Sequence, residues 1–555
     1  MASKTGKDEI AEDIISRNAA LKADRGTWDT LWQQIADYVM PRKSQITTKK
    51  TEDITGFTDD LYNMTAIRAN QVLASGQKDY LVSGQWFSYD PPSDIEDDDA
   101  KTWFQRSTEI TMRELARSNF YLEVHEMFLD RGGFGTACLF LEEGRKMLLN
   151  FKKFDVGTFS IAEDADGMVD TFFREFEMTA RQAYQKFGDM AGKCVCDAMK
   201  GYDPKKLDAK FQFIHAVFPR EDSKRDLKKQ DGQNKPIASI YVNVKDRCIC
   251  RNSGYDEMPL AVSRFLTWGE SPYGYSPSIE ALPTVRQVNF IEKQMDALAE
   301  LAAFPRMLIP ENLEGDIDYR AGGVTTFDPN VPNAIPKEWA TQGRYDVGME
   351  RIKTKDEAIR EAYHNDLFQM LKQIDAGHEM TAYEVAQRVA EKVAAFSPTF
   401  YRLQTEVFGP VLTRVFSMLF RAGKFGEPPA SVIKDEGGEL HLQLPEVTLT
   451  SKLALAIKAA ENNAFMQMIQ ILSGIAELHP EILDNYDLDK AARGIGKNLA
   501  VPTAWQRPQA EVDAIRSERA KAQQAAQAQE AAPGMAKAAK DISEASPSVR
   551  KKLGV

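Results

Sequence analysis

The sequence predicts an α+β protein that is mainly helical. Several long segments repeat apolar residues every three or four positions, which is the spacing of one helix face. Residues 138–178 instead alternate apolar and polar residues around Asp166 and Gly167, which is typical of antiparallel hairpins. At 555 residues the chain is too long for one compact core, so we expect several folded units of roughly 100 to 200 residues each.

The composition is that of an ordinary globular protein, with 43% hydrophobic and 27% charged residues. No apolar run approaches the roughly 18 residues of a membrane span, and the first residues do not form a secretory signal. We therefore expect a cytoplasmic protein with no membrane partner. Five cysteines are too few for a disulfide scaffold. The net charge of -12 argues against a broad basic surface that grips nucleic acid.

The first amphipathic helix is predicted to end at Pro41. Its apolar face carries two tryptophans and three aliphatic residues: Trp28, Leu31, Trp32, Ile35 and Val39. Such a face could dock into the groove of a partner. Aromatic residues at helical spacing more often pack against the protein's own core, so internal packing is the favoured interpretation and partner docking is the alternative.

A second helix is predicted over residues 61–82, followed by five acidic residues between positions 94 and 99. These carboxylates lack the geometry of a metal site, and the dipole at a helix N-terminus favours acidic residues there. We therefore expect a helix start and no metal. The stretch EDADG at residues 163–167 partly resembles a calcium loop, but Ala162 and Phe173 replace the first and last ligands. A turn is expected there.

Beyond the hairpins, Thr179 and Gln182 form a predicted capping box for a helix that ends at Gly188. Strands are predicted over residues 210–222 and 236–244. Two cysteine pairs could supply four thiolates to zinc: Cys194 with Cys196, and Cys248 with Cys250. A single residue between two cysteines crowds the tetrahedral geometry that zinc prefers, so we expect free thiols.

Two long helices are predicted on either side of an irregular segment. Residues 282–304 have strong helical spacing and would span about 35 Å. Residues 305–353 are rich in proline and glycine, and residues 356–374 form the second helix. We expect a helical hairpin that carries a small cap at its tip.

The second helix is interrupted before another one begins. Gly377 ends it, and Thr381 with Glu384 forms a capping box that starts the next helix. Residues 451–500 form a further helical unit, and the Ala- and Gln-rich residues beyond Pro508 are expected to be helical or disordered.

The chain contains no convincing catalytic motif. The segment 491–498 would need glycine in place of Ala491 and serine or threonine in place of Asn498 to form a phosphate-binding loop. Gly133 and Gly135 begin a dinucleotide motif that fails at Cys138. No two of the six histidines have the spacing of a shared metal site on one helix. We expect no enzyme, cofactor or metal.

Several segments together carry a resemblance to a known family. They are the helix ending IADYVMPR, then DLYNMTAIRANQVLASGQ, WFSYDPP, GFGTACLFLEE, DADGMVDTFFREFEMTARQAYQKFG, WGESPYGYSP, MTAYEVAQR and LQTEVFGPVLTRVF. In this order they resemble the head-to-tail connecting (portal) proteins of short-tailed bacteriophages, over residues 10–505.

The resemblance implies the phage portal fold, assembled as a ring, usually a dodecamer. It assigns residues 1–281 to a β-rich wing, 282–304 and 354–374 to a pair of stem helices, 305–353 to an inserted clip, 375–450 to a tunnel loop and wing helices, 451–508 to a helical crown, and 509–555 to a tail.

The resemblance also implies a function and partners. The ring would form the channel at one capsid vertex of the virion, assembled in the host cytoplasm, through which double-stranded DNA is packaged and ejected. Expected partners are the large terminase subunit, the major capsid and scaffolding proteins, and a tail adaptor protein. The alternative is a structural adaptor or scaffold protein of the virion that forms no channel.

Two groups of candidate site residues follow from this resemblance. The DNA-facing group in the tunnel loop comprises Lys372, Gln373, His378 and Glu379, and the partner-docking group comprises Trp28, Trp32, Tyr319 and Trp339. A channel lined with many cations would hold each phosphate, so a weakly charged wall favours sliding. Lys372 and His378 could steer DNA without trapping it, or they could simply face solvent.

Overall fold

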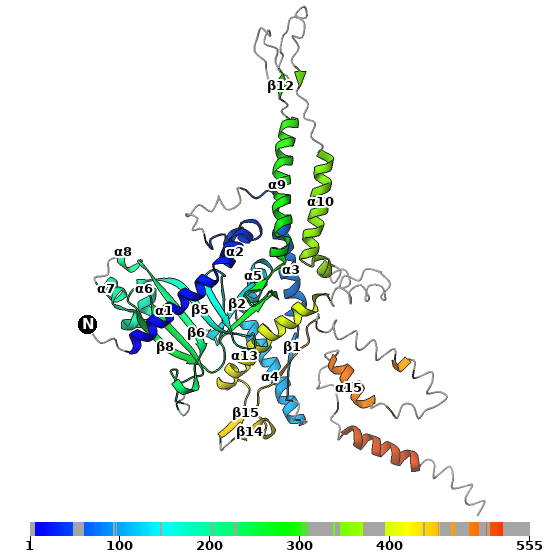
Figure 1. The fold of residues 1–555 in the computed structure, drawn as a ribbon. Helices are drawn as coiled ribbons and strands as arrows, with labels where there is room; N and C mark the ends of the chain where they lie inside the picture. Colours follow the sequence, from blue (N-terminus) through cyan, green and yellow to red (C-terminus); the bar gives the residue numbers. More distant parts are fainter. Residues whose placement is uncertain are drawn as a thin grey trace, which may run out of the picture.

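The protein is described here from a computed structural model, shown as a ribbon in Figure 1. The described residues are 6–47, 60–92, 95, 97–144, 147–200, 204–226, 229, 231–303, 306–308, 337–338, 345–369, 395–436, 439–452, 454, 468–470, 472, 485, 488–498, 507 and 511–525. The chain is α+β, as predicted, and its largest core lies where the N-terminal helices meet a three-stranded sheet.

Helices make up most of the N-terminal body. They are α1 (Gly6–Asp24), α2 (Gly26–Val39), the 3-10 turn η1 (Pro41–Lys43), α3 (Thr65–Leu81), α4 (Asp98–Arg117) and α5 (Phe120–Phe134). Helices α3 and α5 pack closely because α5 has glycine where they meet: a Cβ atom at Gly132 would overlap the Asn70 side chain of α3. Gly135 has a φ of 81° and ends α5, which lets the chain enter a strand at once.

A three-stranded antiparallel sheet joins this body. Its order is β3 (Leu149–Phe154), β2 (Thr136–Glu143) and β9 (Leu260–Arg264). Strand β2 is buried over its first six residues, because it lies in the middle of the sheet and helix α5 packs against it. The predicted hairpin at the start of residues 138–178 is therefore confirmed, in the register Cys138 opposite Phe154.

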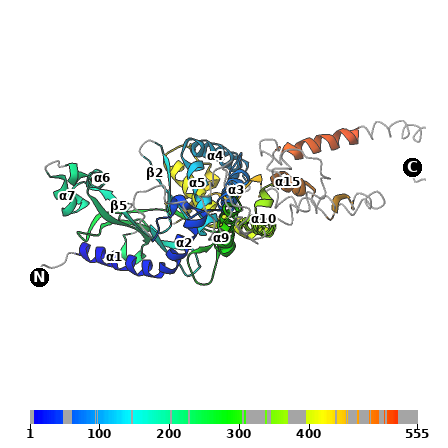
Figure 2. The same cartoon turned by 90° about the horizontal axis from the view of Figure 1, so that it is seen from above.

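A five-stranded antiparallel sheet lies beside the body (Figures 1 and 2). Its strands, in order, are β4 (Phe159–Glu163), β5 (Val169–Thr179), β6 (Lys210–Pro219), β7 (Ile237–Asn243) and β8 (Cys248–Tyr255). Helix α1 packs on one face through Ala11 and Ile14. The other face carries α6 (Ala180–Phe187), the 3-10 turn η3 (Gly188–Ala191) and α7 (Lys193–Met199). Short turns α8 (Pro204–Leu207) and η4 (Asp222–Lys224) complete this region.

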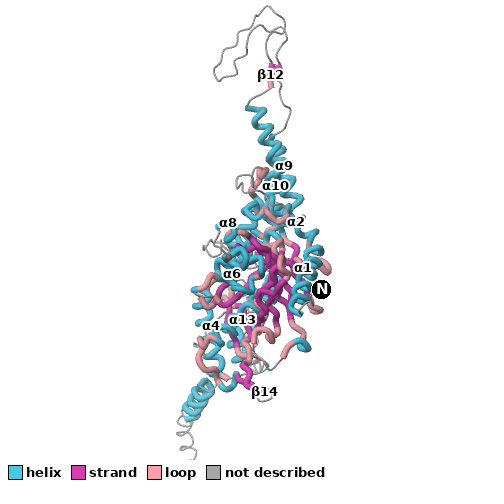
Figure 3. The backbone as a smooth tube through the Cα atoms, turned by 90° about the vertical axis from the view of Figure 1, so that its left-hand side faces the viewer, coloured by secondary structure: helices cyan, strands magenta, loops and turns pink. Residues whose placement is uncertain are grey.

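A helical hairpin projects from the body (Figures 1 and 3). It consists of α9 (Pro277–Ala303), the strand pair β12 (Met307–Leu308) and β13 (Lys337–Glu338), and α10 (Tyr345–Ala362). The small hairpin β10 (Leu266–Thr267) and β11 (Gly274–Tyr275) precedes it. The helices α9 and α10 contact each other, and β12 pairs with β13 in antiparallel register. The structure therefore confirms the predicted helical hairpin, with one helix on each side of the irregular segment.

The C-terminal part returns to the body. Residues 395–403 are helical and continue into the π-helix η5 (Gln404–Phe408) and α13 (Gly409–Arg421). The 3-10 turn η6 (Ala430–Val432), β14 (Ile433–Glu436), β15 (Glu439–Leu442), β16 (Glu446–Leu449) and α15 (Leu488–Asn498) follow, and residues 511–525 are helical. Strand β16 pairs with β1 (Phe87–Asp90), so segments far apart in sequence close the body together.

Local predictions from turn and cap residues hold. Both halves of the Thr179–Gln182 capping box are present, and Gly188 ends that helix. The Asp164 carboxylate accepts hydrogen bonds from the backbone N–H groups of Asp166 and Met168, so EDADG forms the expected turn. Short polar side chains fix these features through neighbours in sequence, which explains why sequence alone predicts them.

The boundaries of the two long helices were predicted less well. Helix α9 begins five positions earlier than expected, because the Ser276 hydroxyl accepts a hydrogen bond from the Ile279 N–H and Pro277 starts the helix. Helix α10 begins at Tyr345 rather than 356, and a turn at residues 363–364 interrupts it. Residues 365–369 are again helical, so the predicted single helix 356–374 is wrong.

Candidate functional site: the helical stem and the junction at its base

The pair α9 and α10, named the stem here, is held by a narrow apolar contact. Met295 of α9 and Ile352 and Ile359 of α10 are buried, and the two helices contact each other. Gly348 permits the close approach, because a Cβ atom there would overlap the sulfur of Met295. The outward faces are exposed, and Phe290 on α9 retains 59% of its surface. Much of the stem surface therefore lacks a partner among the residues that the structure describes.

A polar clamp ties the lower half of the stem to the segment before α3. Asn289 accepts hydrogen bonds from the backbone N–H groups of Tyr62 and Asn63 at 2.7 and 3.1 Å. The Asn63 amide in turn donates to Glu292 at 2.8 Å and to Asp356 at 3.3 Å. Partial burial and the nearby Asp356 raise the pKa of Glu292. One asparagine side chain therefore bridges both stem helices.

The base of the stem turns sharply. Tyr363 is fully buried and its hydroxyl lies 2.6 Å from that of Ser278, which donates to the carbonyl of Gly132. His364 follows with a φ of 53°, in the left-handed region that non-glycine residues rarely occupy. Burial lowers the pKa of His364. The hydroxyl pair and this turn fix where the stem ends.

Aromatic rings hold together the two chain ends that flank residues 370–394. Phe368, before the segment, and Phe396, after it, lie 5.9 Å apart in an edge-to-face contact. His364 contacts Phe396 at 5.5 Å, and Tyr80 of α3 contacts Phe368 at 6.2 Å. Gly76 leaves room for the Phe368 ring, because a Cβ atom there would overlap it. The chain therefore leaves and re-enters the body at one place.

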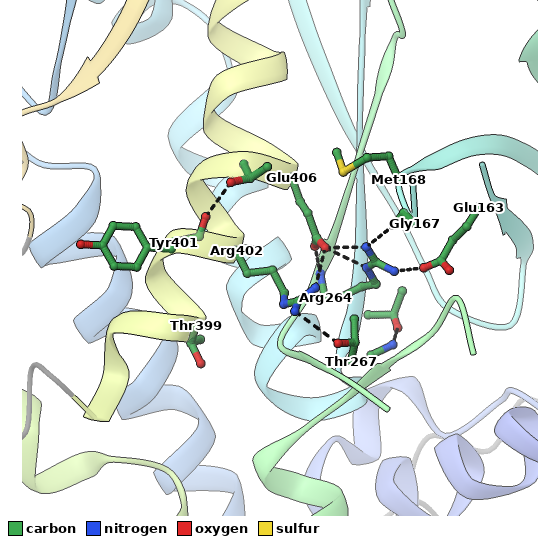
Figure 4. Close-up of polar contacts among 12 residues, drawn as sticks. Glu163, Gly167, Met168, Arg264, Thr267, Thr399, Tyr401, Arg402 and Glu406 are labelled. Carbon is green, nitrogen blue, oxygen red and sulfur yellow. Dashed lines mark hydrogen bonds and ion pairs between the residues drawn. The ribbon is translucent and has the colours of Figure 1, made fainter. Parts of the chain in front are cut away.

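A buried ionic junction anchors the helix that follows (Figure 4). Glu406, on the π-helix η5, accepts hydrogen bonds from the backbone N–H and the Nε of Arg264, each at 2.8 Å. Arg264 also pairs with Glu163 and donates to the carbonyl of Gly167 at 3.0 Å. Arg402 joins Glu406 at 3.2 Å. Strand β9, the β4–β5 turn and η5 therefore meet at one guanidinium group.

A second buried arginine lies beside this junction. Arg131 of α5 donates to the carbonyl of Thr399 at 3.0 Å, and its guanidinium stands 4.7 Å from the centre of the Phe265 ring. Burial lowers the pKa of Arg131, and the nearby Glu406 carboxylate acts in the opposite direction. Glu406 is thus the negative charge shared by Arg131, Arg264 and Arg402, which makes it the centre of the junction.

The structure locates only some of the predicted site residues. Lys372, Gln373, His378 and Glu379 lie outside the described residues, and so do Tyr319 and Trp339. The aromatic contact between Phe368 and Phe396 joins the described residues on either side of the segment 370–394, which contains the predicted tunnel loop.

Trp28 and Trp32 are buried in the core. Trp32 is fully buried and its indole N–H donates to the carbonyl of Phe134 at 2.9 Å, while Trp28 is 8% exposed. Tyr273 packs against both indole rings. These contacts agree with the favoured packing interpretation and correct the partner-docking alternative for this pair, because their surface is already covered.

Sequence reasoning missed three buried charged residues of the junction, although their surroundings carry a signal. Arg131, Arg264 and Glu406 stand within apolar segments, which is a signal that such residues are paired. A single sequence does not say with which partner, since the residues of the Arg264–Glu406 pair are 142 positions apart.

The cysteine pairs come close without forming a metal site. Cys194 on α7 accepts a hydrogen bond from the Asn243 amide, and Cys250 on β8 donates weakly to the carbonyl of Ala191. Burial raises the pKa of Cys194 to about 11, which keeps it a thiol. Within the described part of the chain, no three His, Cys, Asp or Glu side chains are grouped to hold a metal ion. None of the described helices has both the length and the hydrophobicity to cross a membrane.

Comparison with known proteins extends over most of the chain. Residues 11–505 match the family model of the bacteriophage head to tail connecting protein. The chain is 28% identical over 523 residues to the probable portal protein of Bordetella phage BPP-1, covering 93% of this chain and 92% of that protein. It is also 28% identical over 545 residues to the portal protein of Salmonella phage epsilon15, covering 96% and 95%. Since the family match spans nearly the whole chain, including the stem and its base, the chain belongs to the family of bacteriophage head to tail connecting proteins.

Proposed function

We propose that this chain is a phage portal protein, and that copies of it form a ring around a channel for double-stranded DNA. The stem carries this proposal: two contacting helices project from the body, join at β12 and β13, and leave their outward faces exposed. In a ring, the exposed faces of adjacent stems would cover one another. The role is structural, and the partners follow from the family.

The charge of the chain supports a passive channel. A net charge of -12 means that its surface repels phosphate more than it attracts it. DNA moving past many cations would be slowed by each phosphate contact. We assign residues 373–380 to the tunnel loop, with Lys372 just before it and His378 within it as the candidate cations.

The decisive experiment is imaging of the purified protein in negative stain. A closed ring with a central opening supports the proposal. A monomer or dimer at high concentration contradicts it and supports the adaptor alternative, in which the protein connects virion components without enclosing DNA.

The tunnel loop has its own test. Shortening residues 373–380 should reduce the amount of DNA packaged or retained in virions, while rings of the variant still form. Unchanged packaging and retention would remove the loop from the mechanism and leave the ring proposal intact.

A further inference from the structure

A row of cationic and aromatic side chains crosses the five-stranded sheet. Arg174 of β5 is opposite His215 of β6, His215 is opposite Tyr241 of β7, and Tyr241 is opposite Arg251 of β8. Directly paired residues in neighbouring strands point to the same face of a sheet, so these four side chains share one face. We name this row, together with Lys186 of α6, the basic stripe.

The positive charges of the basic stripe rest on aromatic rings rather than on carboxylates. The Lys186 ammonium lies 4.2 Å from the centre of the Tyr241 ring, and the Arg174 guanidinium lies 4.0 Å from that of Phe154. In the described part of the chain no acidic side chain is bonded to Arg174, Lys186 or Arg251. The Nε of Arg174 is buried without a hydrogen-bond partner. That buried nitrogen is out of the reach of an anion, but Arg174 is partly exposed and Lys186 and Arg251 are exposed, so their other donors are available to one.

The surrounding charges leave this region positive. Lys152 lies nearby and pairs with Glu142, which is the acidic side chain that acts most strongly on Lys186. The pKa of Lys186 is lowered to about 8, mainly by burial and in part by the nearby cations Lys152, Arg251 and Arg174. Four cations therefore stand here beside one carboxylate, Glu142, although the net charge of the chain is -12. The cations are Arg174, Lys186, Arg251 and Lys152. The basic stripe is therefore a locally positive region on a chain that is negative overall.

The basic stripe lies away from the stem, and its aromatic rings are covered. Helix α6 and the strands beside it lie at the end of the molecule opposite to α10 in both views (Figures 1 and 2). The rings of the stripe are also unavailable to nucleobases, because Tyr241 is 7% exposed and is stacked on His215 at 4.0 Å. Binding of single-stranded nucleic acid relies on exposed aromatic faces.

We propose that the basic stripe is a docking site for an acidic segment of another protein. Arg174 and Arg251 are three strands apart, which is about 14 Å at the usual strand spacing. An extended peptide presents side chains on one face every two residues, so glutamates four positions apart would reach both guanidinium groups at about the same separation. Carboxylates also suit arginine, which binds them through two parallel hydrogen bonds. This proposal does not require the ring or the channel.

The test is binding of a fluorescein-labelled oligoglutamate peptide to the full-length protein at low ionic strength, followed by fluorescence anisotropy. The double variant Lys186→Gln with Arg251→Gln should bind at least about tenfold more weakly, because two charge-assisted contacts are lost. Both side chains are exposed, so the fold should tolerate the change. The variant Arg251→Lys, which retains the charge, should keep most of the affinity.

A matched control removes two arginines elsewhere. Arg68 on α3 and Arg106 on α4 are exposed, and the double variant Arg68→Gln with Arg106→Gln alters the net charge equally. It should bind the peptide like the unmodified protein. The proposal is overturned if the peptide does not bind, if both double variants weaken it equally, or if a short DNA duplex competes for the stripe more strongly than the peptide. Ring formation is unaffected by any of these outcomes, so the two proposals fail separately.

Discussion

The five-stranded sheet and the stem differ in how much of their surface the chain itself covers. Helices of the chain cover much of both faces of the sheet, α1 on one face and α6 and α7 on the other. The stem buries only the seam between its two helices and leaves Phe290 and Tyr345 largely exposed. The sheet therefore gains its stability from its own core, whereas the stem depends on what surrounds it. Substitutions should have different effects in the two regions.

The largest expected effect lies at the junction between the stem base and the body. Glu406→Ala leaves Arg264 and Arg131 buried with less neutralising charge, which should lower the free energy of unfolding by about 3 to 5 kcal/mol. Urea unfolding measures this loss. Glu406→Gln, which keeps an acceptor, should cost less, and equal losses for the two variants would contradict the charge argument.

The same substitution in the two regions tests the comparison directly. Phe213 on the sheet is fully buried, so Phe213→Ala should cost about 3 to 4 kcal/mol. Phe290 on the stem is 59% exposed, so Phe290→Ala should change the unfolding of the isolated chain by less than about 0.5 kcal/mol. If the ring covers this face, Phe290→Ala should instead reduce the yield of rings in sedimentation experiments. If Phe290→Ala lowered the free energy of unfolding as much as Phe213→Ala does, the stem would not differ from the sheet in how its surface is covered.

The seam of the stem should be sensitive to added volume. Gly348→Ala places a methyl group against the sulfur of Met295, so α9 and α10 must separate or Met295 must change rotamer. We expect a loss of about 1 to 2 kcal/mol. Combining it with Met295→Ala should restore part of the stability, and additive losses would show that the two residues do not share one contact.

Acid should destabilise the sheet through His215. Burial holds the pKa of this histidine well below 6.5, so the folded state stays neutral where the unfolded state takes up a proton. Above pH 6.5, His215 therefore causes no change in the free energy of unfolding. Below pH 6.5, it lowers the free energy of unfolding by up to about 1.4 kcal/mol per pH unit. Urea midpoints on either side of pH 6.5 measure this slope. His215→Asn should reduce it.

The smallest effect, with the opposite sign, is expected in the stem. The raised pKa of Glu292 means that its carboxylate is disfavoured in the folded state, and this penalty disappears as the pH falls through the folded pKa. Glu292→Gln keeps the acceptor for Asn63 and should stabilise the protein at neutral pH by about a few tenths of a kcal/mol, since the site is only partly buried and solvent screens its charge. A loss of stability at neutral pH would contradict this account.

Sequence reasoning worked where neighbouring residues decide the structure. The capping box at Thr179, the turn at Asp164 and the apolar face of α2 each depend on residues a few positions apart. The two long helices were also found, because their spacing extends over many turns. The break at His364 was missed, since its cause is the packing of Tyr363 against Ser278 rather than a proline or glycine.

The junction could not be predicted for a related reason. Glu406 is recognisable as a charged residue in an apolar segment, but its partners Arg264 and Arg131 come from β9 and α5. Which of the many arginines meets it depends on the packing of three separate elements. The basic stripe is similar, because its members are adjacent only through strand register.

The pairing of β12 with β13 has a consequence for how the molecule can be altered. Leu308 and Lys337 are opposite each other, so the chain departs from the stem and comes back at almost the same point. The intervening stretch can therefore be replaced by one of another length without changing the spacing of α9 and α10. A foreign loop inserted between the same two strands should therefore leave the stem helices in place.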